Sequence, residues 1–147
     1  MDAVILIGVP GAGKSTLYRQ RFSETHERLS LDDLKSRDRE HRRMQECIAA
    51  GKSFVVDDTN IHRADRATFI AAARQASYRV IAYFFRLELR AAIKRNSLRS
   101  GKQVVPIPGL IRSWKRLETP TLLEGFDEIW AVDVQPDGSL AVNPYSP

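Results

Sequence analysis

Short runs of apolar residues alternate along the chain with segments in which apolar residues recur every three or four positions. The short runs are typical of buried strands, and the recurring pattern is typical of helices with one apolar face. Strands that alternate with helices predict an α/β fold with a central, mainly parallel sheet and crossover helices. The expected strands span residues 4–9, 29–31, 53–56, 78–87 and 129–132. The expected helices span residues 14–22, 39–50, 63–75, 89–98 and 106–117.

The chain of 147 residues has the length of one domain, and no internal repeat or long linker divides it. We therefore expect a single domain over residues 1–147. A glycine-containing turn is expected at residues 100–103, and a short hairpin around Asp137 and Gly138.

Composition narrows the class of protein. No apolar stretch approaches the roughly 20 residues that span a membrane, and the amino terminus enters a strand at once, which leaves no room for a signal peptide. Cys47 is the one cysteine, so no intrachain disulfide can form, and a cytoplasmic location is expected. Cys47 lies in a helical pattern beside apolar residues, which favours a small core residue over a nucleophile.

Residues 8–15, with the sequence GVPGAGKS, satisfy the phosphate-binding loop pattern G-x-x-x-x-G-K-[ST] at every fixed position. The loop follows an expected strand and precedes an expected helix, which places backbone N–H groups and a helix N-terminus around an anion. Lys14 would reach the β- and γ-phosphates of ATP, and the Ser15 hydroxyl would bind Mg²⁺. The expected nucleotide-binding residues of this segment are Gly8, Pro10, Gly11, Ala12, Gly13, Lys14, Ser15 and Thr16.

Two acidic pairs follow expected strands: Asp32 with Asp33, and Asp57 with Asp58. Because ligands bind beyond the carboxyl ends of parallel strands, these carboxylates are candidates for holding Mg²⁺ or accepting a proton. We expect Asp57 to bind Mg²⁺, directly or through water. A helix N-cap or a turn cap explains either pair equally well from the pattern alone.

The net charge of +5 is concentrated in one segment. Residues 86–116 contain nine basic residues and one acidic residue, a net charge of +8. This concentration suggests a polyanionic ligand, although a solvated face is the simpler alternative. Arg95 and Arg99 share one helix face and could act from a lid over ATP, at about residues 89–105. Trp114, among basic residues, could stack on a base or anchor its helix.

The chain resembles the kinase domain of polynucleotide 5′-hydroxyl kinases, a branch of the P-loop kinases within the P-loop NTPases. The blocks that carry this resemblance are residues 8–16, 30–33, 55–60 and 94–126, and together they reach across about residues 3–133. The resemblance implies a three-layer α/β/α fold with a basic helical lid. It also implies that ATP and Mg²⁺ are used.

The resemblance implies roles residue by residue. Asp32 matches the general base that accepts the proton of a nucleic-acid 5′-hydroxyl, and Asp33 matches the second acid of that pair. Arg99 matches the lid arginine that stabilises the transferring phosphate, with support from Arg95. The residues that match the motif ordering the acceptor and phosphate site are Asp58, Thr59 and Asn60.

This chain departs from the family pattern at Lys35, where phage-type members carry an arginine that contacts the acceptor. A lysine offers a point charge without the bidentate fork of arginine. The 147 residues also contain no phosphatase domain, so a phosphatase or ligase partner would be a separate protein.

The leading hypothesis is therefore an ATP-dependent kinase acting on 5′-hydroxyl ends of DNA or RNA, in nucleic-acid repair or end healing. One alternative is a P-loop kinase with a sugar, nucleoside or antibiotic acceptor. The other is a non-catalytic ATP-binding switch. The sequence leaves open the choice between DNA and RNA, the purine of the donor and the oligomeric state.

Overall fold

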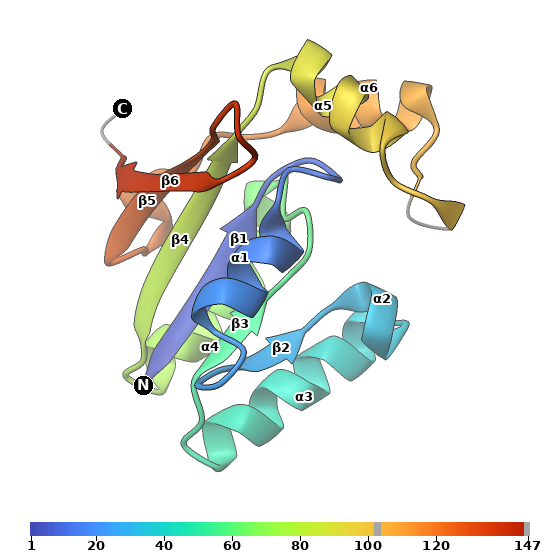
Figure 1. Cartoon of the computed structure of the whole chain (residues 1–147). Helices are drawn as coiled ribbons and strands as arrows, with labels where there is room; N and C mark the ends of the chain where they lie inside the picture. Colours follow the sequence, from blue (N-terminus) through green and yellow to red (C-terminus); the bar gives the residue numbers. More distant parts are fainter. Residues whose placement is uncertain (102–103, 146–147) are drawn as a thin grey trace.

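The computed structural model describes residues 1–101 and 104–145 of the chain (Figure 1). Over these residues the strands form one six-stranded sheet in the order β2-β3-β1-β4-β5-β6. The strands are β1 (Asp2–Ile7), β2 (Glu27–Leu29), β3 (Phe54–Val56), β4 (Arg79–Arg86), β5 (Glu128–Val134) and β6 (Leu140–Pro144). The helices are α1 (Lys14–Arg21), α2 (Leu31–Leu34), α3 (Arg37–Ala49), α4 (Arg63–Gln75), α5 (Leu89–Ser97), α6 (Ile107–Arg116) and the 3₁₀ turn η2 (Leu122–Glu124).

Strands β1 to β5 are parallel, and β1 lies between β3 and β4. Ala3 of β1 is in register with Phe54 on one side and Val80 on the other. Strand β6 runs antiparallel to β5, and Gln135 N–H donates to the Ser139 carbonyl at 2.8 Å in the turn between them. The mainly parallel sheet and the hairpin expected from the sequence are both confirmed.

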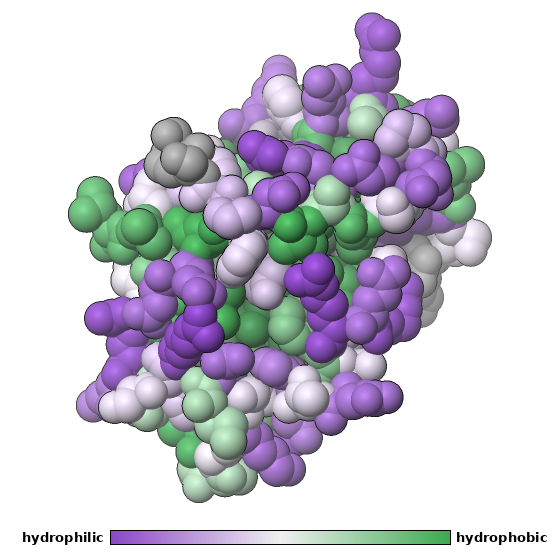
Figure 2. All heavy atoms as spheres, turned by 60° about the vertical axis from the view of Figure 1, so that its left-hand side comes forward, coloured by the Kyte–Doolittle hydropathy of each residue, from purple (hydrophilic) through white to green (hydrophobic). Residues whose placement is uncertain are grey.

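Apolar residues are buried on both faces of the sheet, which gives three layers. On one face, α3 and α4 contribute Met44, Cys47 and Phe69 to a core with the alternate side chains of the strands. On the other face, Leu17 of α1 packs in a second core with Leu110 of α6. Figure 2 shows hydrophilic atoms over much of the outer surface that it presents, with smaller hydrophobic patches between them. The α/β/α architecture is therefore confirmed.

The second strand differs from the expectation. It ends at Leu29, and Asp32 and Asp33 lie on the short helix α2. Helix α2 forms because Leu34 N–H reaches the Ser30 carbonyl at 2.9 Å, while the Asp58 side chain accepts a hydrogen bond from Leu31 N–H at 2.8 Å. The side chain that satisfies the first turn comes from a distant part of the chain, so a local pattern could not reveal it.

The turn expected at residues 100–103 includes Lys102 and Gln103, which lie outside the described residues. Cys47 is fully buried, as expected for a core residue, and burial raises the pKa of its thiol. In residues 1–101 and 104–145 we find no helix with the length and apolar character needed to cross a bilayer.

Candidate active site

The loop between β1 and α1 has the geometry of a phosphate-binding loop. Gly13 is the N-cap of α1 and adopts a left-handed conformation with φ 106°, which disfavours any residue with a side chain. Gly8 has a different reason to be glycine, because a Cβ atom there would lie 2.9 Å from Phe85 Cβ. Gly8 thus permits close packing of the loop on β4, and does not line the cleft as the sequence suggested.

Lys14 lies at the centre of the loop with 9% of its surface exposed. Its Nζ atom donates to the carbonyl oxygens of Gly8 at 2.9 Å and Val9 at 2.8 Å. Burial lowers the pKa of Lys14 to about 8, and the Asp57 carboxylate partly opposes this shift. The Lys14 amino group is therefore held inside the loop, and a bound anion would raise its pKa and favour the charged form.

Ser15 and Asp57 form a candidate magnesium site. Asp57 directly follows β3 and is 6% exposed, and its Oδ2 atom accepts a hydrogen bond from Ser15 Oγ at 3.2 Å. A hydroxyl and a carboxylate suit Mg²⁺, which binds few protein ligands and takes the rest from phosphate oxygens and water. Consistent with that pattern, the described residues contain no cluster of three or more His, Cys, Asp or Glu side chains that could hold a metal alone.

Helix α5 and the residues that directly follow it bring two arginines over the loop, Arg95 from the helix and Arg99 from just beyond its end. Arg95 Nε donates to the Gly11 carbonyl at 2.7 Å. Arg99 lies along the same glycine, and its buried Nη1 atom has no hydrogen-bond partner within the part of the chain that the structure describes. A buried guanidinium nitrogen without a partner beside a phosphate-binding loop fits a bound anion, because such a donor is costly to leave unsatisfied.

The remainder of this lid is also held by side chains. Asn96 is 3% exposed and exchanges two hydrogen bonds with the backbone of Val105, at 2.7 and 2.9 Å, which links α5 to the residue before the N-cap of α6. Trp114 of α6 donates from Nε1 to the Leu87 carbonyl at 2.8 Å. Trp114 thus anchors its helix, with 39% of its surface still exposed.

The acidic pair on α2 faces the cleft and does not cap a helix. Ser30 is the N-cap of α2, and Ser36 caps α3 by accepting a hydrogen bond from Arg39 N–H. Asp32 is exposed, and no hydrogen bond or ion pair to another described residue engages its carboxylate. Asp33 instead pairs with Arg28 at 2.8 Å. Asp32 is therefore available to an incoming ligand.

Residues 58–60 order the loops around the cleft. The Asp58 side chain holds Leu31 N–H, as described above, and the Thr59 carbonyl accepts a hydrogen bond from Gly8 N–H at 3.0 Å. Asn60 is 1% exposed and donates from Nδ2 to the Leu6 carbonyl at 2.8 Å. Asn60 therefore acts behind the cleft, and the expectation that it binds substrate directly does not match its burial.

These segments enclose a cleft of about 1130 Å³. Most of the predicted site residues line it: Pro10, Gly11, Gly13, Lys14, Ser15, Thr16, Asp32, Asp33, Lys35, Asp57, Asp58, Thr59, Arg95 and Arg99. Gly8, Ala12 and Asn60 do not. Ala12 is 1% exposed and contributes to the core beneath the loop.

Sequence reasoning missed two charged residues near the cleft. Arg28 of β2 lines it, but the strand was expected to begin at Leu29, two residues after its observed start at Glu27. Glu40 of α3 is fully buried behind it and accepts a hydrogen bond from Arg37 at 2.9 Å. Burial and the neighbouring Asp58 carboxylate raise the pKa of Glu40 to about 8. The sequence offered one signal for the burial of Glu40: it lies on the same helix face as the apolar residues Met44 and Cys47.

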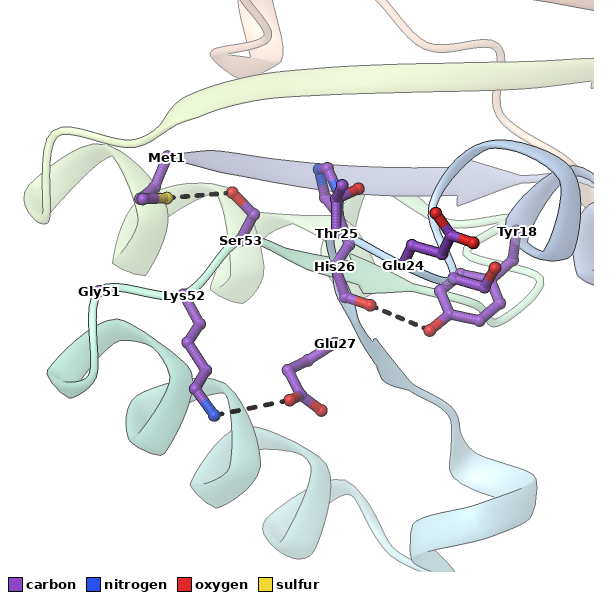
Figure 3. A pocket seen from close by; sticks show the side chains of 10 residues that line it. Met1, Tyr18, Glu24, Thr25, His26, Glu27, Gly51, Lys52 and Ser53 are labelled. Carbon is purple, nitrogen blue, oxygen red and sulfur yellow. Dashed lines mark hydrogen bonds and ion pairs between the residues drawn. The ribbon is translucent and has the colours of Figure 1, made fainter.

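A second, smaller hollow of about 440 Å³ lies at the amino ends of β1, β2 and β3, away from the loop (Figure 3). Several of its polar groups pair with one another. Lys52 pairs with Glu27 at 3.6 Å, and the Tyr18 hydroxyl donates to the His26 carbonyl at 2.9 Å. The larger cleft is the candidate active site, because it contains the phosphate-binding loop, the exposed Asp32 carboxylate and Arg99, which the smaller hollow lacks.

Comparison with known proteins agrees with this geometry. The family model described as an AAA domain (AAA_33) matches residues 4–118. A curated bifunctional polynucleotide phosphatase/kinase from Schizosaccharomyces pombe is 28% identical over 134 residues, which is 87% of this chain. The match covers 32% of that relative, so this chain spans about a third of its length.

Solved structures share the fold at low identity. A gluconokinase from Sinorhizobium meliloti 1021 has a TM-score of 0.65 and 22% identity, covering 92% of this chain and 84% of its own. A sugar kinase from Janibacter sp. HTCC2649 has a TM-score of 0.65 and 18% identity, covering 90% and 85%. Chaetomium thermophilum Kti12, in complex with ADP-AlF3, has a TM-score of 0.64 and 16% identity, covering 92% of each chain. With the loop, the sheet and the family model in agreement, the chain belongs to the AAA domain family and has a P-loop kinase fold.

Proposed function

We propose that this chain is an ATP-dependent kinase that transfers the γ-phosphate to the 5′-hydroxyl end of DNA or RNA. One observation carries the kinase assignment. A single cleft holds a phosphate-binding loop, an available carboxylate at Asp32 and a buried guanidinium nitrogen of Arg99 that has no partner among the described residues. A phosphate donor, a proton acceptor and a stabiliser of transferring charge are the parts that phosphoryl transfer needs.

In this proposal, bound ATP with Mg²⁺ supplies the phosphoryl group and neutralises part of its charge. Lys14 and the backbone N–H groups of the loop hold the phosphates, and Ser15 and Asp57 hold the metal. Asp32 accepts the proton of the attacking hydroxyl, because it is exposed to the cleft and has no competing partner within the described residues. Arg99 stabilises negative charge on the phosphate, with Arg95 keeping the lid on the loop.

Two features support a nucleic-acid acceptor. The curated relative that matches 87% of this chain is a bifunctional polynucleotide phosphatase/kinase. The lid helices α5 and α6 also carry exposed basic residues that pair with no carboxylate of the described residues, and they are Arg90, Lys94, Arg112, Lys115 and Arg116. Such a surface attracts a phosphate backbone.

A small-molecule acceptor is the second candidate, favoured by the structural similarity to a gluconokinase and to a sugar kinase. Salt separates the two candidates. Because counterion release accompanies nucleic-acid binding, the KM for an oligonucleotide rises steeply with salt, whereas the KM for a neutral sugar changes little.

The direct test is transfer of labelled γ-phosphate from ATP to a short 5′-hydroxyl oligonucleotide with Mg²⁺. We expect Asp32→Asn to lower kcat by about 10²–10⁴ while leaving the affinity for nucleotide unchanged. Asp38→Asn is the matched control, since Asp38 is an exposed aspartate on the neighbouring helix α3.

Full transfer by Asp32→Asn would refute the proposed base. Transfer to gluconate or another sugar, with none to DNA or RNA, would refute the acceptor. ATP binding with no transfer to any acceptor would favour a non-catalytic switch.

A further inference from the structure

Arg28 connects three polar groups of the cleft through three different nitrogen atoms. Its Nε donates to Asp57 Oδ2 at 2.8 Å, its Nη1 donates to Asp33 Oδ2 at 2.8 Å, and its Nη2 lies 3.4 Å from Ser15 Oγ. Ser15 and Asp57 form the candidate magnesium site, and Asp33 lies beside the proposed base on α2. The guanidinium group therefore stands between the metal site and the acceptor side of the cleft.

The contact with Asp57 involves the same oxygen that contacts Ser15. Asp57 Oδ2 accepts hydrogen bonds from Ser15 Oγ at 3.2 Å and from Arg28 Nε at 2.8 Å. The Asp57 side chain is 3% exposed, so the carboxylate has little access to solvent cations from elsewhere. A divalent cation held by Ser15 and Asp57 would need the groups that the guanidinium now contacts.

Arg28 is held in place by more than Asp57. Its guanidinium carbon lies 5.9 Å from the centre of the Tyr18 ring, and the Tyr18 hydroxyl is fixed by its hydrogen bond to the His26 carbonyl (Figure 3). Asp33, whose side chain is 59% exposed, anchors the other end of the guanidinium. Arg28 can therefore release Asp57 while keeping the contacts with Asp33 and Tyr18.

We propose that Arg28 is an internal cation that competes with Mg²⁺ for Asp57, so that the metal binds well only together with the nucleotide. An arginine keeps its charge at every working pH, so it raises the cost of placing a second cation beside it. The negative charge of a triphosphate offsets that cost, because it adds both ligands and attraction for the metal. Because of Arg28, the metal would therefore bind together with the nucleotide and not before it. The inference rests on the proposed nucleotide and magnesium site and is independent of the acceptor.

The test uses Mn²⁺ as the probe, with free Mn²⁺ followed by electron paramagnetic resonance in the absence of nucleotide and acceptor. We expect Arg28→Gln to bind Mn²⁺ about tenfold more tightly than the wild type, because a positive charge next to the site is gone. Arg28→Lys keeps the charge and is expected to stay within about twofold of the wild type. The matched control is Arg19→Gln. Arg19 lines the same cleft but is exposed and contacts only the Thr16 hydroxyl at 3.4 Å among the described side chains.

The site is identified by adding Asp57→Asn to Arg28→Gln, which should abolish the tighter binding. Arg28→Gln that binds Mn²⁺ no more tightly than the wild type would overturn the proposal and make Arg28 an orienting residue. A tightening of equal size in Arg19→Gln would also overturn it, since the effect would then be general charge.

A second measurement follows Arg28 in the wild type and uses a variant only to assign the resonance. The Nε–H resonance of Arg28, assigned by its loss in Arg28→Lys, should move when ADP and Mg²⁺ are added together and stay in place with ADP alone. An Arg28 resonance that is unchanged in the loaded protein would overturn the release of Asp57. Because neither measurement contains an acceptor, failure of the oligonucleotide kinase assay leaves both results meaningful.

Discussion

The phosphate-binding loop and the two segments that face it across the cleft are positioned by different kinds of contact. The loop is held through backbone groups: Gly8 N–H donates to the Thr59 carbonyl, and the Lys14 side chain donates to the backbone carbonyls of Gly8 and Val9. Helix α2 has no fully buried residue; Leu34 packs against the core, and the distant Asp58 side chain accepts a hydrogen bond from Leu31 N–H. The lid helix α5 reaches the loop through Arg95.

This difference suggests how one P-loop kinase fold can serve several acceptors. Backbone contacts tolerate substitution of the surrounding side chains, so the donor site persists when the sequence changes. A contact made by one side chain is lost or altered by a single substitution. The position of the facing segments can therefore change as the protein adapts to another acceptor. The two regions should then respond differently to mutation.

Substitution of Arg99, which lies over the loop, should lower the rate of phosphoryl transfer more than substitution of Asp58 or Glu40. For Arg99→Ala we expect kcat to fall by about 10³, near the low end of what a catalytic arginine contributes, with nucleotide affinity changed little. Single-turnover transfer and equilibrium binding of a fluorescent ADP would measure the two quantities. Arg90→Ala, which changes an exposed arginine of the helix α5 that precedes Arg99, is the matched control. A loss below tenfold would place Arg99 among the solvated residues of the lid.

Asp58 tests the anchoring of α2. Asp58→Ala removes the acceptor for Leu31 N–H, and we expect the KM for the acceptor to rise about tenfold, a typical cost of one buried hydrogen bond to a charged group. Asp58→Asn keeps an oxygen in place and should behave closer to the wild type. Affinity for nucleotide should remain unchanged in both. Equal losses of nucleotide and acceptor binding would contradict the separation of the two regions.

Lys14 gives the loop its own pH dependence. Burial lowers the pKa of Lys14 to about 8, and a bound phosphate favours the charged form, so nucleotide binding takes up a proton above that pH. We expect affinity for ADP to weaken about fivefold to tenfold between pH 7.5 and pH 9. Calorimetry in two buffers of different ionisation enthalpy would detect the proton. Affinity that is flat across this range would place the Lys14 pKa outside it.

Glu40 should give the smallest effect, on stability. Its pKa is raised to about 8, so the folded state holds a proton that the unfolded state releases, and stability is lost as the pH rises from about 4.5 to about 8. Glu40→Gln removes that proton exchange. Its Tm should exceed that of the wild type by several degrees at pH 8.5 and match it near pH 5. A larger difference at the lower pH would contradict the assignment.

The sequence by itself determined the parts of this protein that depend on neighbouring residues. The strand, glycine loop and helix around Lys14 are one continuous segment, and the alternation of apolar runs with amphipathic helices predicted an α/β fold with a mainly parallel sheet. The cleft residues of the phosphate-binding loop and of the two acidic pairs followed from their positions at strand ends, whereas Lys35 and Thr59 were expected from the resemblance. The start of the lid helix at Leu89 was also predictable from its local pattern.

Only the tertiary structure decided which distant residues meet. Arg28 and Asp57 are 29 positions apart, and Arg95 and Gly11 are 84 positions apart, so no local window contains both members of either pair. Their proximity follows from the strand order, which places β2 beside β3 and brings the lid over the end of β1. The pairing of β2 with β3 also explains why β2 ends at Leu29. Asp58, which follows β3, accepts the hydrogen bond of Leu31 N–H in the first turn of α2. Local periodicity encodes the elements, but packing between strands that are separated by crossover helices selects the partners of each charge.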